Sequence, residues 1–127
     1  MEQYLIDTNV VSDYFSASLS AAGLDLMDTA IDAVANVSII TQIELFCWNT
    51  DEATTQSVQN FIADCSVLGI GADVIDQCVR LRKGKKIKTP DAIIAATALA
   101  YGYSLITNNE KDFAGIKGLK IINPMKL

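Results

Sequence analysis

Short β-branched runs that alternate with helical patterns restrict this chain to few folds. Five runs are predicted as strands: one that ends at Ile6, and the stretches 37–40, 67–70, 104–107 and 119–122. Between them, apolar residues recur at helical spacing, as in 24–34, where aspartates lie opposite the apolar face. This alternation favours an α/β fold with a mainly parallel sheet of about five strands flanked by helices. The length of 127 residues suits a single domain, residues 1–127.

Capping and turn residues indicate where helices begin and end. Residues 16–23 are rich in serine, alanine and glycine and are predicted to form a loop. A helix is predicted over 41–48, and Asp51 is expected to cap the next one. Pro90 opens a later helix, at a position where its missing N–H is not needed, and Gly102 ends it.

The composition excludes several classes of protein. The chain has no histidine, so histidine-based triads and histidine-ligated metals are excluded. Cys47, Cys65 and Cys78 lie in apolar patterns and are predicted to be buried, reduced thiols, as in a reducing compartment. No apolar run approaches the roughly 18 residues of a membrane span, and no basic residue precedes the first apolar segment. We therefore expect a cytoplasmic protein without a secretory signal or a membrane partner.

The charges are divided between the two parts of the chain. Residues 1–79 hold twelve acidic side chains and no Lys or Arg, whereas residues 80–127 hold all ten basic side chains and three acids. The segment 80–88 alone carries six positive charges and is expected to be exposed and mobile. Either it is a solvated loop or it binds a polyanion. The candidate basic residues are Arg80, Arg82, Lys83, Lys85, Lys86 and Lys88.

Asp7 lies where the first strand leaves the sheet. Sites in open parallel sheets form at the carboxyl ends of strands, so this carboxylate is well placed for chemistry. Thr8 and Asn9 add polar groups beside it. The alternative is that Asp7 only caps the helix that follows.

Other acidic residues are expected at the same edge of the sheet. Glu44 has capping-box spacing from Thr41, and Asp91 lies in a first helical turn, so each has a possible structural role. Helix starts and strand ends share one edge in such folds, however. Carboxylates that converge there without a basic neighbour would repel one another unless a cation such as Mg²⁺ or Mn²⁺ neutralised them. The chemistry that fits is metal-assisted phosphodiester hydrolysis.

Four motifs in this order resemble the PIN domain family, and within it VapC-type toxins of toxin–antitoxin pairs. They are Ile6-Asp7-Thr8-Asn9, Glu44 in 40–45, Asp91 in 89–98, and Thr107-Asn108-Asn109 followed by Asp112-Phe113. The resemblance runs from Tyr4 to about Pro124. It implies a PIN-like fold, a Mg²⁺-dependent endoribonuclease acting on RNA, frequent homodimers and a cognate antitoxin.

The resemblance also implies roles for individual residues. Asp7 and Asp91 match the principal metal-binding acids of the family, and Glu44 matches the third. Many relatives have Asp where this chain has Asn109, so we expect Asp112 to be the fourth acid and Asn109 the weaker candidate. Thr8, Asn9 and Thr107 are expected to be further polar groups of the site, and the basic segment 80–88 is expected to contact RNA. Asp112 could instead cap a segment that begins at Phe113.

Three other functions were weighed against the toxin. A housekeeping PIN nuclease of RNA processing would use the same site. An aspartyl-phosphate phosphatase would need Asp two residues after Asp7, where this chain has Asn9. A non-catalytic α/β interaction module would use all four acids as caps, which does not explain why they share one edge.

Overall fold

Five parallel strands form one sheet in the computed structural model, which describes residues 2–127. The order across the sheet is β3-β2-β1-β4-β5, so β1 is central, and every neighbouring pair is parallel. The strands are β1 (Tyr4–Ile6), β2 (Asn36–Ser38), β3 (Ser66–Leu68), β4 (Ser104–Ile106) and β5 (Ile121–Ile122). The α/β fold with a five-stranded parallel sheet is therefore confirmed.

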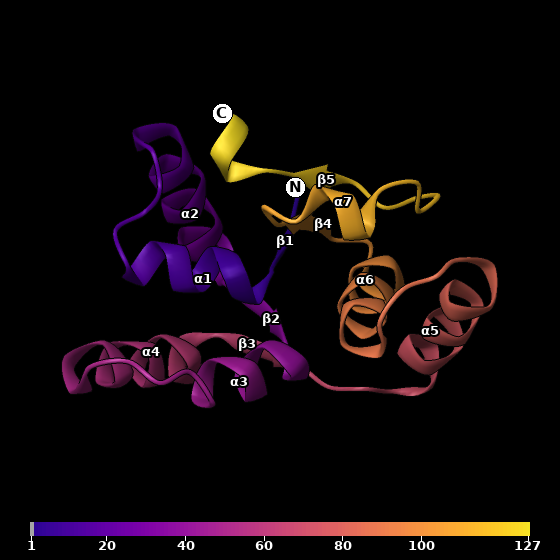
Figure 1. Cartoon of the computed structure of the whole chain (residues 1–127), viewed down its shortest axis with the longest axis horizontal. Helices are drawn as coiled ribbons and strands as arrows, with labels where there is room; N and C mark the ends of the chain where they lie inside the picture. The colour runs from indigo at the N-terminus through magenta and orange to yellow at the C-terminus, as the bar shows by residue number, and fades with distance from the viewer. Residues whose placement is uncertain (1) are drawn as a thin grey trace.

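Helices cover both faces of this sheet (Figure 1). They are α1 (Thr8–Phe15), α2 (Ala21–Val34), α3 (Ile39–Phe46), α4 (Glu52–Asp64), α5 (Ala72–Gly84), α6 (Thr89–Tyr101), the short α7 (Glu110–Phe113) and the 3-10 turn η1 (Pro124–Lys126). Adjacent strand residues face opposite sides, so Ile6 packs into a core with α1, α2 and α4, and Leu5 packs into a second core with α6 and α7.

Several element boundaries differ from the sequence-based expectation, including the helix expected over 41–48, which is α3 (Ile39–Phe46), and the cause is clear at β2 and α2. Strand β2 ends at Ser38, whose side chain caps α3 by accepting a hydrogen bond of 3.1 Å from the Ile40 N–H. The β-branched residues Ile39 and Ile40 therefore begin a helix instead of extending the strand. Ser20 caps α2 in the same way, so this helix begins inside the stretch that was expected to be a loop.

The basic segment is not a free loop along its whole length. Helix α5 continues to Gly84, so Arg80, Arg82 and Lys83 lie on a helix, and only residues 85–88 form the connection to α6. Arg82 donates a hydrogen bond of 2.6 Å to Thr89 Oγ1 at the start of α6. This contact and the packing of the two helices hold the segment against α6.

The cysteines are less buried than predicted. Cys47 is exposed, because α3 ends at Phe46 and Cys47 is the C-cap at the surface. Cys65 and Cys78 are half-buried, and burial raises the pKa of the Cys65 thiol to about 12. All three thiols are free, as predicted. Among residues 2–127, no helix combines the length and the apolar character needed to cross a membrane.

Candidate active site

Asp7 is a helix cap and a buried cavity residue at once. Its side chain is 4% exposed, and its Oδ1 accepts a hydrogen bond of 2.8 Å from the Thr8 N–H at the start of α1. Its Oδ2 accepts a bond of 2.8 Å from the Thr107 hydroxyl and one of 3.3 Å from the Asn9 amide. The capping interpretation is thus correct, and the same carboxylate still faces a cavity.

Burial and neighbouring carboxylates raise the pKa values of Asp7 and Asp91. The pKa of Asp7 is raised from 3.8 to about 6, mainly because burial disfavours its charged form, with smaller contributions from Asp91 and Glu44. Hydrogen bonds from Thr107 and Thr8 act in the opposite direction. The pKa of Asp91 is also raised, first by burial and then by Asp112 and Glu44. Because their charged forms are disfavoured in the site without a cation, these aspartates would be stabilised by a bound cation.

Asp7, Glu44 and Asp91 line one cavity of about 430 Å³, although they come from the end of β1, from α3 and from α6. This confirms the expectation that strand ends and helix starts bring them to one edge. The cavity is also lined by Thr8, Asn9, Ser12, Leu45, Trp48 and Asn109. Within the described part of the chain, no three acidic or cysteine side chains are grouped closely enough to hold a metal ion by themselves.

Glu44 is held from another helix and does not cap its own. Thr8 Oγ1 lies 2.6 Å from Glu44 Oε1, to which it donates, and 3.0 Å from Thr41 Oγ1. The alternative that Glu44 forms a capping box with Thr41 is wrong, because Ser38 caps α3 three residues earlier. Glu44 itself is exposed, so its carboxylate is free to meet a ligand.

The fourth candidate acid lies beside the cavity. Asn109 lines the cavity, and its amide donates a hydrogen bond of 2.8 Å to Asp112 Oδ2. The Asn109 N–H donates in turn to Thr107 Oγ1 at 3.0 Å. Asp112 lies inside α7, so the alternative that it caps a segment beginning at Phe113 is wrong.

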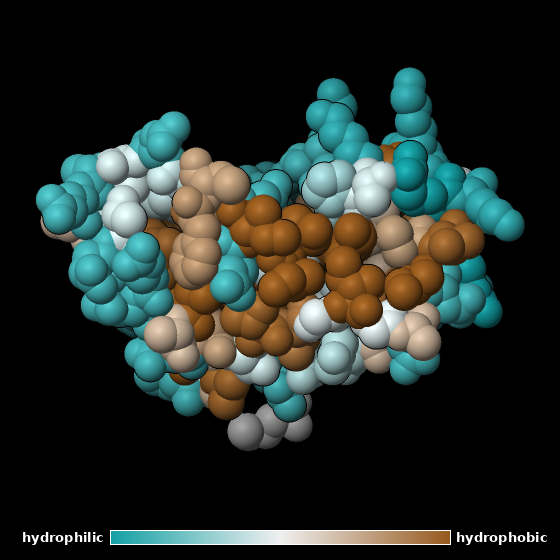
Figure 2. Space-filling view, turned by 90° about the horizontal axis from the view of Figure 1, so that it is seen from below, coloured by the Kyte–Doolittle hydropathy of each residue, from teal (hydrophilic) through white to brown (hydrophobic). Residues whose placement is uncertain are grey.

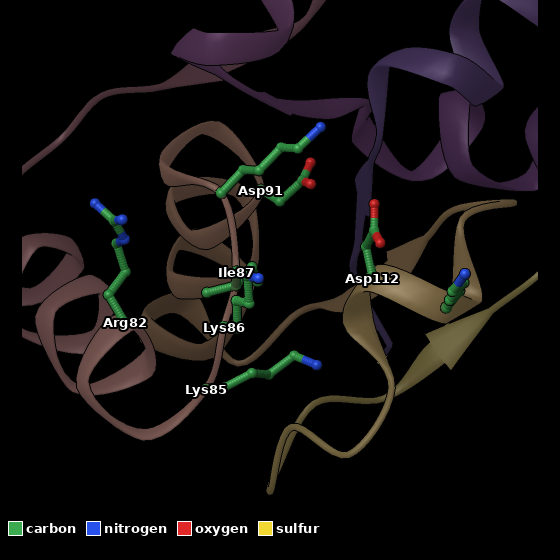
Figure 3. Close-up of a pocket in the computed structure, with 8 residues that line it drawn as sticks. Arg82, Lys85, Lys86, Ile87, Asp91 and Asp112 are labelled. Carbon is green, nitrogen blue, oxygen red and sulfur yellow. The ribbon is translucent and has the colours of Figure 1, made fainter.

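A second cavity, of about 520 Å³, adjoins the first and is bordered mainly by basic residues. Figure 3 shows Asp91 on α6 and Asp112 on α7, while Lys85 extends from the connection between α5 and α6 in the direction of α7. The complete lining is Arg82, Lys85, Lys86, Ile87, Lys88, Asp91, Lys111 and Asp112. Asp91 borders both cavities, so the acidic and basic sites adjoin at this residue. Of the predicted basic residues, Arg80 and Lys83 are not in this lining.

Sequence reasoning missed five residues of these linings, and Trp48 and Lys111 are the two with an aromatic or charged side chain; the others are Ser12, Leu45 and Ile87. Trp48 follows Glu44 by four positions, which on a helix places the two on one side, and this spacing could have signalled it. Lys111 is brought opposite the basic connection only by the position of α7. No local pattern in the sequence reports that contact.

The chain is similar to a known protein family, to a curated ribonuclease over a short stretch, and to solved structures. The model of the PIN domain matches residues 4–119. A 36-residue stretch is 56% identical to Ribonuclease VapC1 of Rickettsia felis, and it spans 28% of this chain and 27% of that relative. The structure is similar to a toxin–antitoxin complex from Klebsiella pneumoniae, with 33% identity, coverage of 96% of this chain and 98% of that one, and a TM-score of 0.76.

A second solved structure supports the fold alone. FitAcB from Neisseria gonorrhoeae is 22% identical, covers 98% of this chain and 100% of its own, and gives a TM-score of 0.82. The family match covers nearly the whole length and includes the four motifs, of which three supply the acids of the cavity and the fourth supplies Asn109. This chain therefore belongs to the PIN domain family.

Proposed function

We propose that this protein is a divalent-metal-dependent endoribonuclease and the toxin of a toxin–antitoxin pair. The observation that carries the proposal is the cavity in which Asp7, Glu44 and Asp91 meet, with burial and mutual repulsion raising the pKa values of the two aspartates. The name of the short Rickettsia match, a ribonuclease, and the Klebsiella toxin–antitoxin complex agree with it.

The donor set fits Mg²⁺ or Mn²⁺. All the charged groups are carboxylates, the ligands that hard cations prefer, and a partly open cavity leaves room for water and phosphate. We propose Asp7, Asp91 and Glu44 as ligands, with Asp112 as the fourth acid, held by Asn109. When bound, the cation would polarise the phosphodiester and stabilise the charge that develops on its oxygens.

The protein groups orient this chemistry. Asp7 is held in place by Thr107 and by the first N–H of α1, so its carboxylate needs no reordering when RNA binds. Glu44 is exposed and receives the Thr8 hydrogen bond on one oxygen, which leaves the other oxygen to orient a water or accept its proton.

The basic cavity would hold RNA phosphates next to the cleaved one. Its basic lining residues are Arg82, Lys85, Lys86, Lys88 and Lys111, and it adjoins the acidic cavity at Asp91. Lys83 lies in the same basic segment but outside this lining, so it is the matched control. Lys86→Gln should weaken RNA binding more than Lys83→Gln, and equal effects would count against this cavity as the RNA path.

A cognate antitoxin is proposed as the protein partner. Without a cation the site is an anionic cavity, which a basic side chain would neutralise. We therefore expect the antitoxin to present Arg or Lys near Asp7 or Asp91. The free thiols agree with a reducing cytoplasm as the location of the complex. A gene for a small DNA-binding protein directly upstream would favour the toxin over a housekeeping nuclease.

Homodimerisation is proposed through an apolar face. Figure 2 shows apolar side chains gathered over α3, α5 and the connection before α5. The large exposed residues of these elements, each 45–53% exposed, are Ile43, Phe46, Ile70, Ile75 and Val79. Large exposed apolar patches mark interaction sites. Light scattering should show a dimer that Val79→Asp weakens, whereas a parent protein that stays monomeric would refute this proposal.

The enzymatic proposal is tested by RNA cleavage in Mg²⁺ and in Mn²⁺. Cleavage should stop in chelator and in the variants Asp7→Asn and Asp91→Asn, which nearly preserve shape but remove a charge. Circular dichroism should show that both variants are folded like the parent protein. If these variants lose fold and activity together, the acids act only as caps and the proposal fails.

A further inference from the structure

Trp48 is an aromatic wall of the acidic cavity. It follows the end of α3 and lines the same cavity as Asp7, Glu44 and Asp91. It is the single tryptophan of the chain, and it is the one aromatic side chain in the lining of that cavity. The roles proposed above for Asp7, Glu44 and Asp91 do not involve this aromatic ring.

The indole is held firmly but remains partly open. The Trp48 side chain packs against the core formed with α1, α2 and α4, and the backbone N–H of Trp48 donates a hydrogen bond of 3.2 Å to the Leu45 carbonyl. Its other side borders a smaller pocket of about 130 Å³, which Val58 and Thr55 of α4 also line. The side chain is half-buried, so one part of the ring packs inside while another part meets the cavity.

The two cavities differ in what they offer a nucleotide strand. The basic cavity beyond Asp91 offers cations to phosphates and is bordered by no aromatic residue. The acidic cavity repels phosphate unless a cation is present, but its aromatic wall offers a surface to a base. Each phosphodiester links two nucleosides, so a phosphate that binds among the carboxylates brings a base close to them.

We propose that Trp48 is a stacking platform for the nucleobase that flanks the cleaved phosphodiester. This inference rests on the proposed ribonuclease function and adds a specificity-determining residue to it. Stacking on an aromatic ring is sequence-tolerant and is worth about 5- to 100-fold in affinity per base. A rigid indole also loses little freedom when a base binds, since the core already holds it.

A nucleotide fits this wall better than an apolar segment of a protein partner. The ring shares its cavity with three carboxylates, and an apolar protein segment there would bury them without a counter-charge. A nucleotide places its base on the indole while its phosphate can bind a cation between the acids. The antitoxin remains the competing occupant that the experiment must separate.

The single tryptophan gives a direct measurement of stacking. The full-length Glu44→Gln variant in Mg²⁺ keeps Asp7 and Asp91 and should bind RNA without cleaving it. It is titrated with a single-stranded RNA oligonucleotide and with an abasic oligonucleotide of equal length and charge, and binding is followed separately by anisotropy of a label. We expect the RNA to quench Trp48 fluorescence and the abasic strand to bind without quenching. RNA that binds without changing the fluorescence overturns the inference.

Kinetics in the otherwise unchanged protein provide the second test. Trp48→Leu keeps apolar packing but removes the ring face, so it should raise KM by about 5- to 100-fold with a smaller change in kcat, and Trp48→Phe should lie between it and the parent. Tyr101→Leu, an exposed aromatic outside both cavities, is the matched control and should leave KM unchanged. If Trp48→Leu does not fold, Trp48→Phe and the fluorescence titration still decide.

The outcomes are distinguishable from those of the proposed function. Metal-dependent cleavage with an unchanged KM in Trp48→Leu overturns this inference alone. A Trp48→Leu variant that keeps its KM but escapes inhibition by the antitoxin assigns the residue to the protein partner and also overturns it. If the parent protein does not cleave RNA with any divalent metal, the proposed function fails and this inference fails with it.

Discussion

Replacing Asp7 by asparagine should stabilise the metal-free protein while it abolishes cleavage. The pKa of Asp7 is raised from 3.8 to about 6, so its ionised form is unfavourable in the fold. A tenfold change in proton affinity corresponds to about 1.4 kcal/mol, so keeping this carboxylate charged at pH 7.5 costs about 3 kcal/mol. Asparagine has nearly the same shape and carries no charge.

Hydrogen bonds offset part of this gain. Asparagine keeps one carbonyl oxygen that can accept from the Thr8 N–H, but its amide nitrogen faces the Thr107 hydroxyl and the Asn9 amide, which both donate to the native carboxylate. A lost hydrogen bond of this kind costs about 1 kcal/mol. We therefore expect a net gain of about 1–2 kcal/mol, or a rise of about 5 °C in Tm for a domain of this size.

The dependence on pH gives the sign of the effect. Because the folded-state pKa of Asp7 lies above its unfolded value, the native protein binds the extra proton, and its stability rises as pH falls from about 6 to 3.8. Urea denaturation in chelator at pH 7.5 and at pH 4.5 measures this. The advantage of Asp7→Asn over the parent should be largest at pH 7.5 and should shrink at pH 4.5.

A matched control has the opposite sign. Asp51 is also a helix N-cap, but it is exposed, and hydrogen bonds from the N–H and hydroxyl of Thr54 lower its pKa. Its contribution to stability is present at neutral pH and is lost in acid, so Asp51→Asn should not stabilise the protein at pH 7.5. If Asp7→Asn destabilises the metal-free protein at pH 7.5, the carboxylate is mainly structural and the argument from repulsion is refuted.

Three other predictions follow from the site. Glu44→Gln should lower kcat by orders of magnitude with little change in Tm, because Glu44 does not cap α3; a drop in Tm with normal turnover would contradict this. Asp112→Asn should reduce activity and weaken metal binding measured by calorimetry, while Asn109→Ala should do so less; a silent Asp112→Asn would rule it out as the fourth acid. Replacing Lys85 and Lys86 by Gln should weaken RNA binding and make the affinity less dependent on salt. The slope of log affinity against log salt concentration should fall by roughly 0.7 for each phosphate contact that is lost. An unchanged slope would exclude the two lysines from phosphate binding.

The sheet and the edge that carries the site could be predicted from the sequence. Strand and helix periodicities are local, and parallel topology then places Asp7, Glu44 and Asp91 at one edge without further information. The Pro90 and Gly102 signals also correctly mark the ends of α6. These successes depend only on residues close to each other in the chain.

The details that failed depend on contacts between distant residues. Thr41 and Glu44 have capping-box spacing, but Ser38 starts the helix, and Glu44 instead accepts a hydrogen bond from Thr8, 36 residues earlier. Local propensity also favoured a strand through Ile40, where the serine cap prevails. Asp112 and Lys111 are placed opposite the connection between α5 and α6 by the position of α7, which no local pattern encodes.

The Thr107–Asp7 hydrogen bond joins residues 100 positions apart, and this separation has a consequence for biosynthesis. The central strand β1 is made first, but its partner β4 and the residues that orient Asp7 come near the other end of the described chain. A growing polypeptide on the ribosome cannot have this site before residue 107 has been made and β4 has paired with β1. The helices α1–α4 are therefore translated before the proposed nuclease site is assembled. A partner that recognises those helices would meet a chain that cannot yet cleave RNA at this site.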